Sequence, residues 1–144
     1  CNVSAKGTCF VGANLEGADF SSANAPFADF TGANLKKAVF RDAVLEQASF
    51  EGADLTEADL SLANLSRIRA GEAVAEATLF LRTRLDYAEF PHANLNLANF
   101  GEANLEGANL HAISEVGTKW NGAVLKKVRK TDKKLLEAET WEPK

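Results

Sequence analysis

Residues 92–110 read HANLNLANFGEANLEGANL, and within this stretch an Ala, an Asn and then a Leu or Phe return every five residues. The same unit occurs far away in the chain, as GANLEGADF at residues 12–20 and as GADLTEADL at residues 52–60. A period of five fits neither an α-helix, which repeats every ~3.6 residues, nor a flat strand, which repeats about every two. A chain that turns one corner per five residues satisfies it, so we expect a solenoid.

The repeat keeps one phase from Phe10 to Leu125. Every fifth residue in this range, here named the centre, is Leu in 11 of 24 cases and Phe in 8. The residue two positions before the centre is Ala in 18 of 24 cases, and Asn or Asp often stands between them. We expect the centre and Ala side chains to fill the interior, because larger residues at every Ala position would overfill a narrow tube. The other two positions should form exposed turns, where glycines such as Gly12, Gly52 and Gly107 tolerate positive φ.

Phenylalanine centres return every ten residues over most of the repeat, with leucine centres between them. If four repeats complete one coil, residues that are twenty apart in the sequence stack on one another. Two opposed aromatic rows then follow, one of Phe10, Phe30, Phe50 and Phe90 and one of Phe20, Phe40, Phe80, Phe100 and Trp120. With about 4.8 Å between coils, about six coils would give a rod about 29 Å long.

These motifs resemble the pentapeptide-repeat family, and the resemblance covers about residues 6–125. It implies the fold of that family, an all-β, right-handed quadrilateral β-helix of about six coils. We expect an N-terminal cap segment at residues 1–7, the solenoid at residues 8–125 and a C-terminal helical cap or tail at residues 126–144. Asp132 or Thr131 should cap a short helix there, and Trp141 should close onto the last coil, because a solenoid needs its open end covered.

Residues 66–79 depart from the repeat without changing its phase. The centres here are Ala70 and Ala75, and Ile68 stands at an Ala position. Ile68 can compensate for the small Ala70 by volume exchange, whereas Ala75 has no such partner. We therefore expect a distorted coil near 66–79; the alternative is an extruded loop or short helix whose length is a multiple of five.

Arginine and aromatic residues gather beside this departure. On a four-sided coil they should form a surface of the composition that protein interfaces favour. The alternative is an ordinary solvated face, neutralised by Glu72, Glu76, Asp86 and Glu89. The candidate interaction patch consists of Arg67, Arg69, Arg82, Arg84, Tyr87 and Phe27.

Composition and motifs argue against an enzyme and against a nucleic-acid binder. The formal net charge is −4 and the charged fraction is 25%, without the basic excess of a nucleic-acid protein. There is no apolar run of the roughly 20 residues that span a membrane, and no nucleophile or phosphate-binding motif. His92 and His111 are expected to face outward on different faces, without metal-ligand spacing. We expect no catalytic residues, no metal and no cofactor.

The cysteines bear on the cellular compartment. Cys1 and Cys9 lie close together, and a disulfide between them would staple the N-terminal segment and imply an oxidising compartment. Two unpaired thiols are the alternative, and they fit a cytoplasmic location. The sequence starts at Cys1 and contains no Met, so we expect a processed form or a piece of a longer protein.

The expected function is that of a non-enzymatic rigid scaffold or protein–protein interaction module, with another protein as its partner. Two alternatives follow from the family resemblance and from the cysteines. One is a DNA mimic that binds a type II topoisomerase, as some members of the family do; the other is a structural protein of the periplasm or thylakoid lumen. A homodimer through a terminal cap is a further alternative, whereas direct nucleic-acid binding and a membrane span are not expected.

Overall fold

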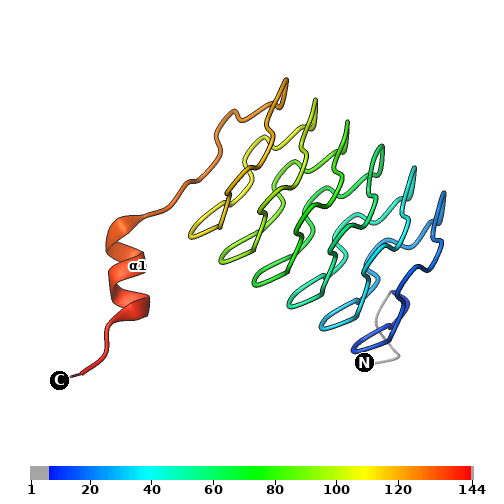
Figure 1. The fold of residues 1–144 in the computed structure, drawn as a ribbon, viewed down its shortest axis with the longest axis horizontal. Helices are drawn as coiled ribbons and strands as arrows, with labels where there is room; N and C mark the ends of the chain where they lie inside the picture. Colours follow the sequence, from blue (N-terminus) through cyan, green and yellow to red (C-terminus); the bar gives the residue numbers. More distant parts are fainter. Residues whose placement is uncertain (1–6, 144) are drawn as a thin grey trace.

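The computed structural model describes residues 7–143, in which a stack of four-sided coils is followed by helix α1, Lys133–Thr140 (Figure 1). Each side of a coil contributes one residue to a parallel bridge with the residue twenty positions further along. The bridges form four ladders, which we name after their first residues, Cys9, Asn14, Asp19 and Asn24. The twenty-residue coil that the phenylalanine spacing predicts is therefore confirmed.

Main-chain hydrogen bonds tie each coil to the next at every bridge. Ser49 shows the pattern, since its N–H donates to the carbonyl of Ala28 at 2.9 Å and its own carbonyl accepts from the N–H of Phe30 at 2.8 Å. Each bridge is isolated, so a side of the coil pairs through a single residue rather than through a longer strand. The stack is held by repetition of one small unit, as in other solenoids.

Where Asn or Asp stands before a centre, its side chain often bonds the backbone of the next corner. The Oδ1 of Asp19 accepts the N–H of Ser21 at 2.9 Å, and the Oδ1 of Asp54 accepts the N–H of Thr56 at 3.0 Å. The corner then closes with a second bond, such as that from the N–H of Ala13 to the carbonyl of Phe10 at 3.0 Å. A short side chain that bonds the backbone two residues on favours such turns, which explains the choice of Asn and Asp.

The second residue of each corner has a positive φ, whether or not it is glycine. Seven glycines adopt it, at φ values from 62° to 72°, and so do 17 other residues, at values from 52° to 64°. The left-handed conformation costs a non-glycine residue roughly 1–2 kcal/mol. At the 17 non-glycine positions, the coil-to-coil hydrogen bonds and the interior packing therefore outweigh the local preference of the residue with positive φ.

The interior is filled as the repeat predicts, by centres and by the Ala two positions before them. The phenylalanines stack along the rod, with ring centroids 5.0 Å apart for Phe10 and Phe30 and 4.9 Å for Phe20 and Phe40. The two rows meet edge to face across the tube, at 5.5 Å between Phe30 and Phe40. Offset stacks and edge-to-face pairs are the favourable ring geometries, so the aromatic rows add specific attraction to simple burial.

Residues 66–79 keep the regular backbone, and the distortion expected there is not found in the main chain. Arg69 bridges to Ser49 and Glu89 in the ordinary register, and Ala70 and Ala75 are fully buried. The register depends on main-chain bonds that side-chain volume does not alter. The unusual residues change only the packing inside the tube. Ile68 is buried beside the small Ala70, and Thr78 is buried with its Oγ1 donating to the carbonyl of Leu55 at 2.7 Å.

Helix α1 does not cover the end of the solenoid (Figure 1). Asp132 is its N-cap and accepts the N–H groups of Lys134 and Leu135, at 3.0 and 3.2 Å. No residue of α1 is buried, and Trp141 is 71% exposed, so the prediction that it closes onto the last coil is wrong. The helix is attached through polar contacts at one corner instead. It is too short and too polar to cross a membrane, and it is the one helix among residues 7–143.

Candidate functional site

The structure distributes the six residues of the predicted patch over two corners and two ladders. Phe27, Arg67 and Tyr87 share one corner, which we name the Tyr87 corner and which comprises residues 27, 47, 67, 87, 107 and 127. Arg84 belongs to the Asn24 ladder on one side of this corner, and Arg69 belongs to the Cys9 ladder on the other. Arg82 lies at the preceding corner. The coil therefore brings five of the six residues to one edge of the rod.

A cation–aromatic stack occupies the middle of the Tyr87 corner. The guanidinium carbon of Arg67 lies 5.3 Å from the ring centroid of Tyr87, one coil further along. The ring in turn covers Gly107, where a Cβ would come within 2.5 Å of Tyr87 Cε1. Gly107 thus supplies both the positive φ of 69° and the room for the ring. Arg67 and Tyr87 remain exposed, so the stack presents a charge and an aromatic edge to a partner.

Arg84 and Arg82 are engaged by carboxylates. The Nε of Arg84 lies 2.9 Å from Oδ1 of Asp86, which also accepts the hydroxyl of Ser66 at 2.7 Å. Burial raises the pKa of Asp86, but the hydrogen bonds from Ser66 and Arg84 outweigh it and hold the pKa below its ordinary value. Arg82 turns along its own corner to Glu102, with 2.7 Å between Nε and Oε2. The expected neutralisation by carboxylates is thus present for Arg84, through Asp86.

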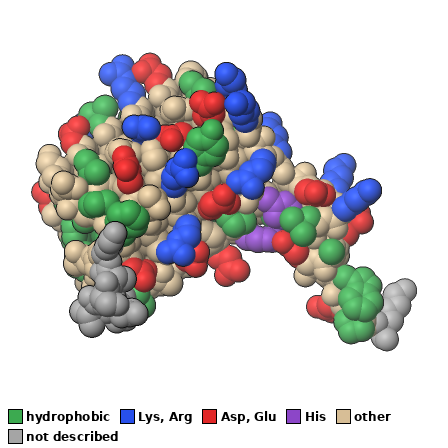
Figure 2. All heavy atoms as spheres, turned by 180° about the vertical axis from the view of Figure 1, so that it is seen from behind, with side chains coloured by type: hydrophobic (Ala, Val, Ile, Leu, Met, Phe, Trp, Pro, Cys, Tyr) green, Lys and Arg blue, Asp and Glu red, His purple; other side chains and the backbone are tan. Residues whose placement is uncertain are grey.

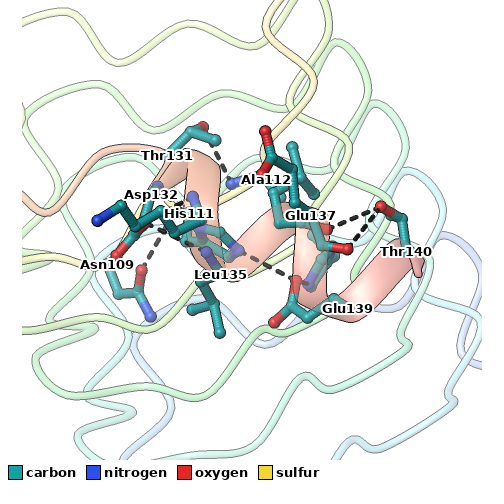
Figure 3. Close-up of polar contacts among 12 residues, drawn as sticks. Asn109, His111, Ala112, Thr131, Asp132, Leu135, Glu137, Glu139 and Thr140 are labelled. Carbon is teal, nitrogen blue, oxygen red and sulfur yellow. Dashed lines mark hydrogen bonds and ion pairs between the residues drawn. The ribbon is translucent and has the colours of Figure 1, made fainter.

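The two histidines lie together, contrary to the prediction that they face different sides. Their ring centroids are 5.4 Å apart, and both Nε2 atoms approach the same oxygen, Oε2 of Glu139, at 3.0 Å for His92 and 3.1 Å for His111. Figure 3 shows Glu139 facing His111. His92 and His111 are 19 residues apart, almost one coil, so they occupy one corner, residues 12, 32, 52, 72, 92 and 112 with their predecessors. The separation of 19 residues, close to the twenty-residue coil, is the feature of the sequence that indicates this pair. Nothing in the repeat points to Glu139, which lies on α1.

We name His92, His111 and Glu139 the histidine clasp. These residues form the group of possible metal ligands in the described chain, with ligand atoms within 4.8 Å of one another. However, the N–H of Asp132 donates to Nδ1 of His111 at 3.1 Å, so the neutral ring carries its proton on Nε2 and donates it to Glu139 (Figure 3). A metal at Nε2 would need the opposite tautomer, with Nδ1–H donating. The arrangement fits a hydrogen-bonded attachment of α1 better than a metal centre.

Glu139→Ala is expected to loosen α1 while leaving the coils intact. The carboxylate is the shared acceptor for both histidines, and α1 buries no residue that could hold it otherwise. Loss of these part-exposed bonds should cost about 1 kcal/mol, or about a fivefold rise in the open population. Limited proteolysis should therefore cleave residues 130–143, which follow the last bridge at Arg129, about five times faster, with an unchanged thermal midpoint. Glu137→Ala on the same helix is the control, and equal cleavage of the two variants would contradict the clasp.

The predicted disulfide involves a residue outside the described part of the chain. Cys9 begins the Cys9 ladder, where it bridges to Asp29, whereas Cys1 falls among the undescribed residues 1–6. A disulfide between Cys1 and Cys9 therefore stays a prediction.

Comparison with known proteins identifies the repeat. A family model described as pentapeptide repeats matches in 8 copies, over residues 2–36, 33–69 and 78–112. Among curated proteins no sequence matches the chain significantly.

Solved structures of similar proteins are repeat proteins as well. HetL, which is involved in heterocyst differentiation regulation in Nostoc, is 29% identical over 83% of this chain and 60% of its own length, with a TM-score of 0.37. A pentapeptide repeat protein of the Arabidopsis thaliana thylakoid lumen is 33% identical over 79% of this chain and 62% of its own length, with a TM-score of 0.39. QnrB1, a plasmid-mediated fluoroquinolone resistance protein, is 20% identical over 90% and 86%, with a TM-score of 0.42. The chain thus spans less than two thirds of the first two proteins.

Proposed function

The chain belongs to the pentapeptide-repeat family, whose fold is a right-handed β-helix, and we propose that it is a non-enzymatic rigid scaffold that binds another protein along one corner of its rod. Pentapeptide-repeat proteins are generally structural or interaction modules. The interior of this rod is filled by its own side chains, so recognition falls to outward residues. We take residues 8–125, about six coils, as the scaffold unit.

The Tyr87 corner is the observation that carries this proposal. Phe27 and Tyr87 each expose 45% of their surface. A phenylalanine at a corner does not add to the packing of the interior, so the position of Phe27 needs another explanation. Arg67 is exposed beside Tyr87 and stacks on its ring. Arginine and tyrosine are enriched among residues that dominate binding energy, because they join a large contact area to directional hydrogen bonds. Held on a repeating backbone, they lose little further freedom on binding.

A comparison of captured partners tests this proposal. Immobilised wild type and the variant Arg67→Ala/Arg69→Ala/Arg84→Ala are exposed to an extract of the source cells, and Tyr87→Ala is tested separately. We expect partner recovery to fall about tenfold or more for the triple variant, since each hot-spot truncation costs upwards of about 1 kcal/mol. Lys36→Ala/Lys37→Ala, which removes two exposed charges at another corner, is the control. Equal recovery by the wild type and the triple variant would refute the assignment of the Tyr87 corner.

DNA mimicry directed at a type II topoisomerase ranks second. A mimic needs a continuous acidic face, and the chain has a net charge of only −4. Arg69 lies between Asp29 and Glu89 on the Cys9 ladder, and Arg129 extends back to Glu89 at 2.7 Å. Figure 2 shows acidic and basic side chains intermixed on the face it draws. Gyrase supercoiling assays decide the matter: we expect no effect of the protein, and dose-dependent inhibition would favour the mimic.

The compartment and the oligomeric state belong to the same proposal. A disulfide between Cys1 and Cys9 would favour the periplasm or the thylakoid lumen, and reduced thiols would favour the cytoplasm. Thiol titration of denatured, unreduced protein distinguishes them. A homodimer through the C-terminal end would cover Leu125 and Val124, which are exposed on the last coil.

A further inference from the structure

A second surface lies at the corner that precedes the Tyr87 corner. We name it the Leu62 corner; it comprises residues 22, 42, 62, 82, 102 and 122 with their predecessors. An open groove of about 770 Å³ runs along it, with Leu62 and Leu81 among its apolar lining residues. The groove exists because small residues, Ser61 and Gly101, alternate with larger ones along the column. A Cβ on Gly101 would lie 3.1 Å from Leu81 Cδ2, so Leu81 leans into the space that the glycine leaves.

The length of the groove matches a short extended peptide. Its lining runs from Arg41 to Asn121, which is four coils or about 19 Å at about 4.8 Å per coil. An extended peptide of about six residues matches the length.

More basic than acidic side chains line the groove, although two of the basic ones are paired, Arg41 with Asp59 and Arg82 with Glu102. Three basic side chains line it, those of Arg41, Arg82 and Lys119, against one carboxylate, that of Glu102. Arg41 and Arg82 are about two coils apart in the sequence, and so are Arg82 and Lys119, which is about 10 Å along the rod in each case. A polyproline II helix advances about 9.3 Å per turn of three residues, so every third side chain would meet the next basic residue.

One of the two ion pairs in the groove is weak enough for a ligand carboxylate to replace the protein's own. Arg82 and Glu102 expose 68% and 61% of their side chains, so their pair is weak and a ligand carboxylate can replace Glu102. Arg41 is different, because its partner Asp59 is 20% exposed at 3.0 Å. Burial raises the pKa of Asp59, but hydrogen bonds from Ser61 and Arg41 outweigh this effect, and the pKa lies below its ordinary value. The carboxyl therefore stays ionised and keeps Arg41 at the wall of the groove.

We propose that the groove of the Leu62 corner binds an acidic peptide segment of a partner protein in the polyproline II conformation. A carboxylate at every third position faces Arg41, Arg82 or Lys119, and apolar side chains between them pack on Leu62 and Leu81. This surface is separate from the Tyr87 corner and goes beyond the scaffold function, with Arg82 as the residue common to it and the predicted patch.

Fluorescence anisotropy with a defined probe tests the groove. The probe is the labelled peptide Glu-Pro-Leu-Glu-Pro-Leu-Glu, and its comparison is a peptide of the same composition with the three Glu residues adjacent. We expect the probe to bind the intact chain, and Leu62→Asn and Arg82→Asn each to weaken binding about tenfold. Asn tolerates the positive φ of both positions, 62° and 52°, so these variants should fold. Lys37→Asn, at a φ of 58° on another corner, is the matched control.

The outcomes separate this proposal from the preceding one. Equal binding of the two peptides, or loss of binding with Arg82→Asn but not with Leu62→Asn, would show attraction to any polyanion and overturn the groove. Absence of binding to the ordered probe would overturn it as well. Arg67→Ala/Arg69→Ala/Arg84→Ala should leave probe binding within about twofold, because these residues lie outside the groove lining. Partner capture by the Tyr87 corner is measured independently, so either proposal can fail alone.

Discussion

Phe40→Ala is expected to lower the free energy of unfolding by about 3–5 kcal/mol, the cost of removing a fully buried phenylalanine. The Phe40 ring is completely buried and stacks on Phe20 at 4.9 Å. It also meets Phe30 and Phe50 edge to face, at 5.5 and 5.9 Å. The substitution therefore removes apolar burial and specific ring contacts together, and the narrow tube cannot collapse without breaking bonds between coils.

Urea denaturation followed by circular dichroism measures this loss. Phe27→Ala is the matched control, because the same side chain is removed from a corner where it is 45% exposed. We expect the control to change the free energy of unfolding by less than about 0.5 kcal/mol, as for ordinary surface substitutions. If the two variants were equally destabilised, the assignment of Phe40 to the interior and Phe27 to the surface would be wrong.

Because Ile68 and Ala70 compensate for each other in volume, the effects of substituting them on the free energy of unfolding should be strongly non-additive. Ile68→Ala alone should cost about 2–5 kcal/mol through the cavity it leaves, and Ala70→Phe alone about 1–3 kcal/mol through overpacking. Together they recreate the usual unit of Ala followed by a Phe centre, as in Ala48 and Phe50. The new ring would continue the row that Phe30 and Phe50 form at 5.0 Å spacing. We expect the double variant to lie within about 1 kcal/mol of the wild type.

A double-mutant cycle in urea decides this prediction. The coupling free energy between the two positions should be several kcal/mol, because each residue fills the space that the other leaves. A double variant as unstable as the sum of the single ones would contradict volume exchange. In that case the regular backbone of residues 66–79 would need another explanation than compensation inside the tube.

The interior could be predicted from the sequence because the five-residue repeat determines which side chains face it. Every centre must face the axis, so Phe10 and Phe30 stack for the same reason that they are twenty residues apart. The positive φ of the corners was predictable where Gly stands, as at Gly52, but a residue such as Arg67 carries no such signal. Its conformation is imposed by neighbouring coils, and a local pattern cannot report it.

The surface contacts were harder to predict, because they depend on positions that the repeat leaves free. His92 and His111 could have been paired by counting almost one coil between them, had corners been compared instead of faces. Glu139 and the exposed Trp141 could not, because α1 follows the last repeat and no period fixes where a helix docks. The groove of the Leu62 corner depends on Leu81 leaning over Gly101, which is a tertiary effect.

The four-sided coil also governs how such a protein can change its length. An insertion of twenty residues adds one complete turn, so every later residue keeps its column and only the distances along the rod increase. An insertion of five adds one side, which rotates all that follows by a quarter turn and moves Tyr87 out of line with Phe27. It also moves the later phenylalanines off the rows in which residues twenty apart stack, as Phe30 and Phe50 do. Insertions and deletions of whole twenty-residue turns therefore preserve both the aromatic rows and the columns of the outer surface.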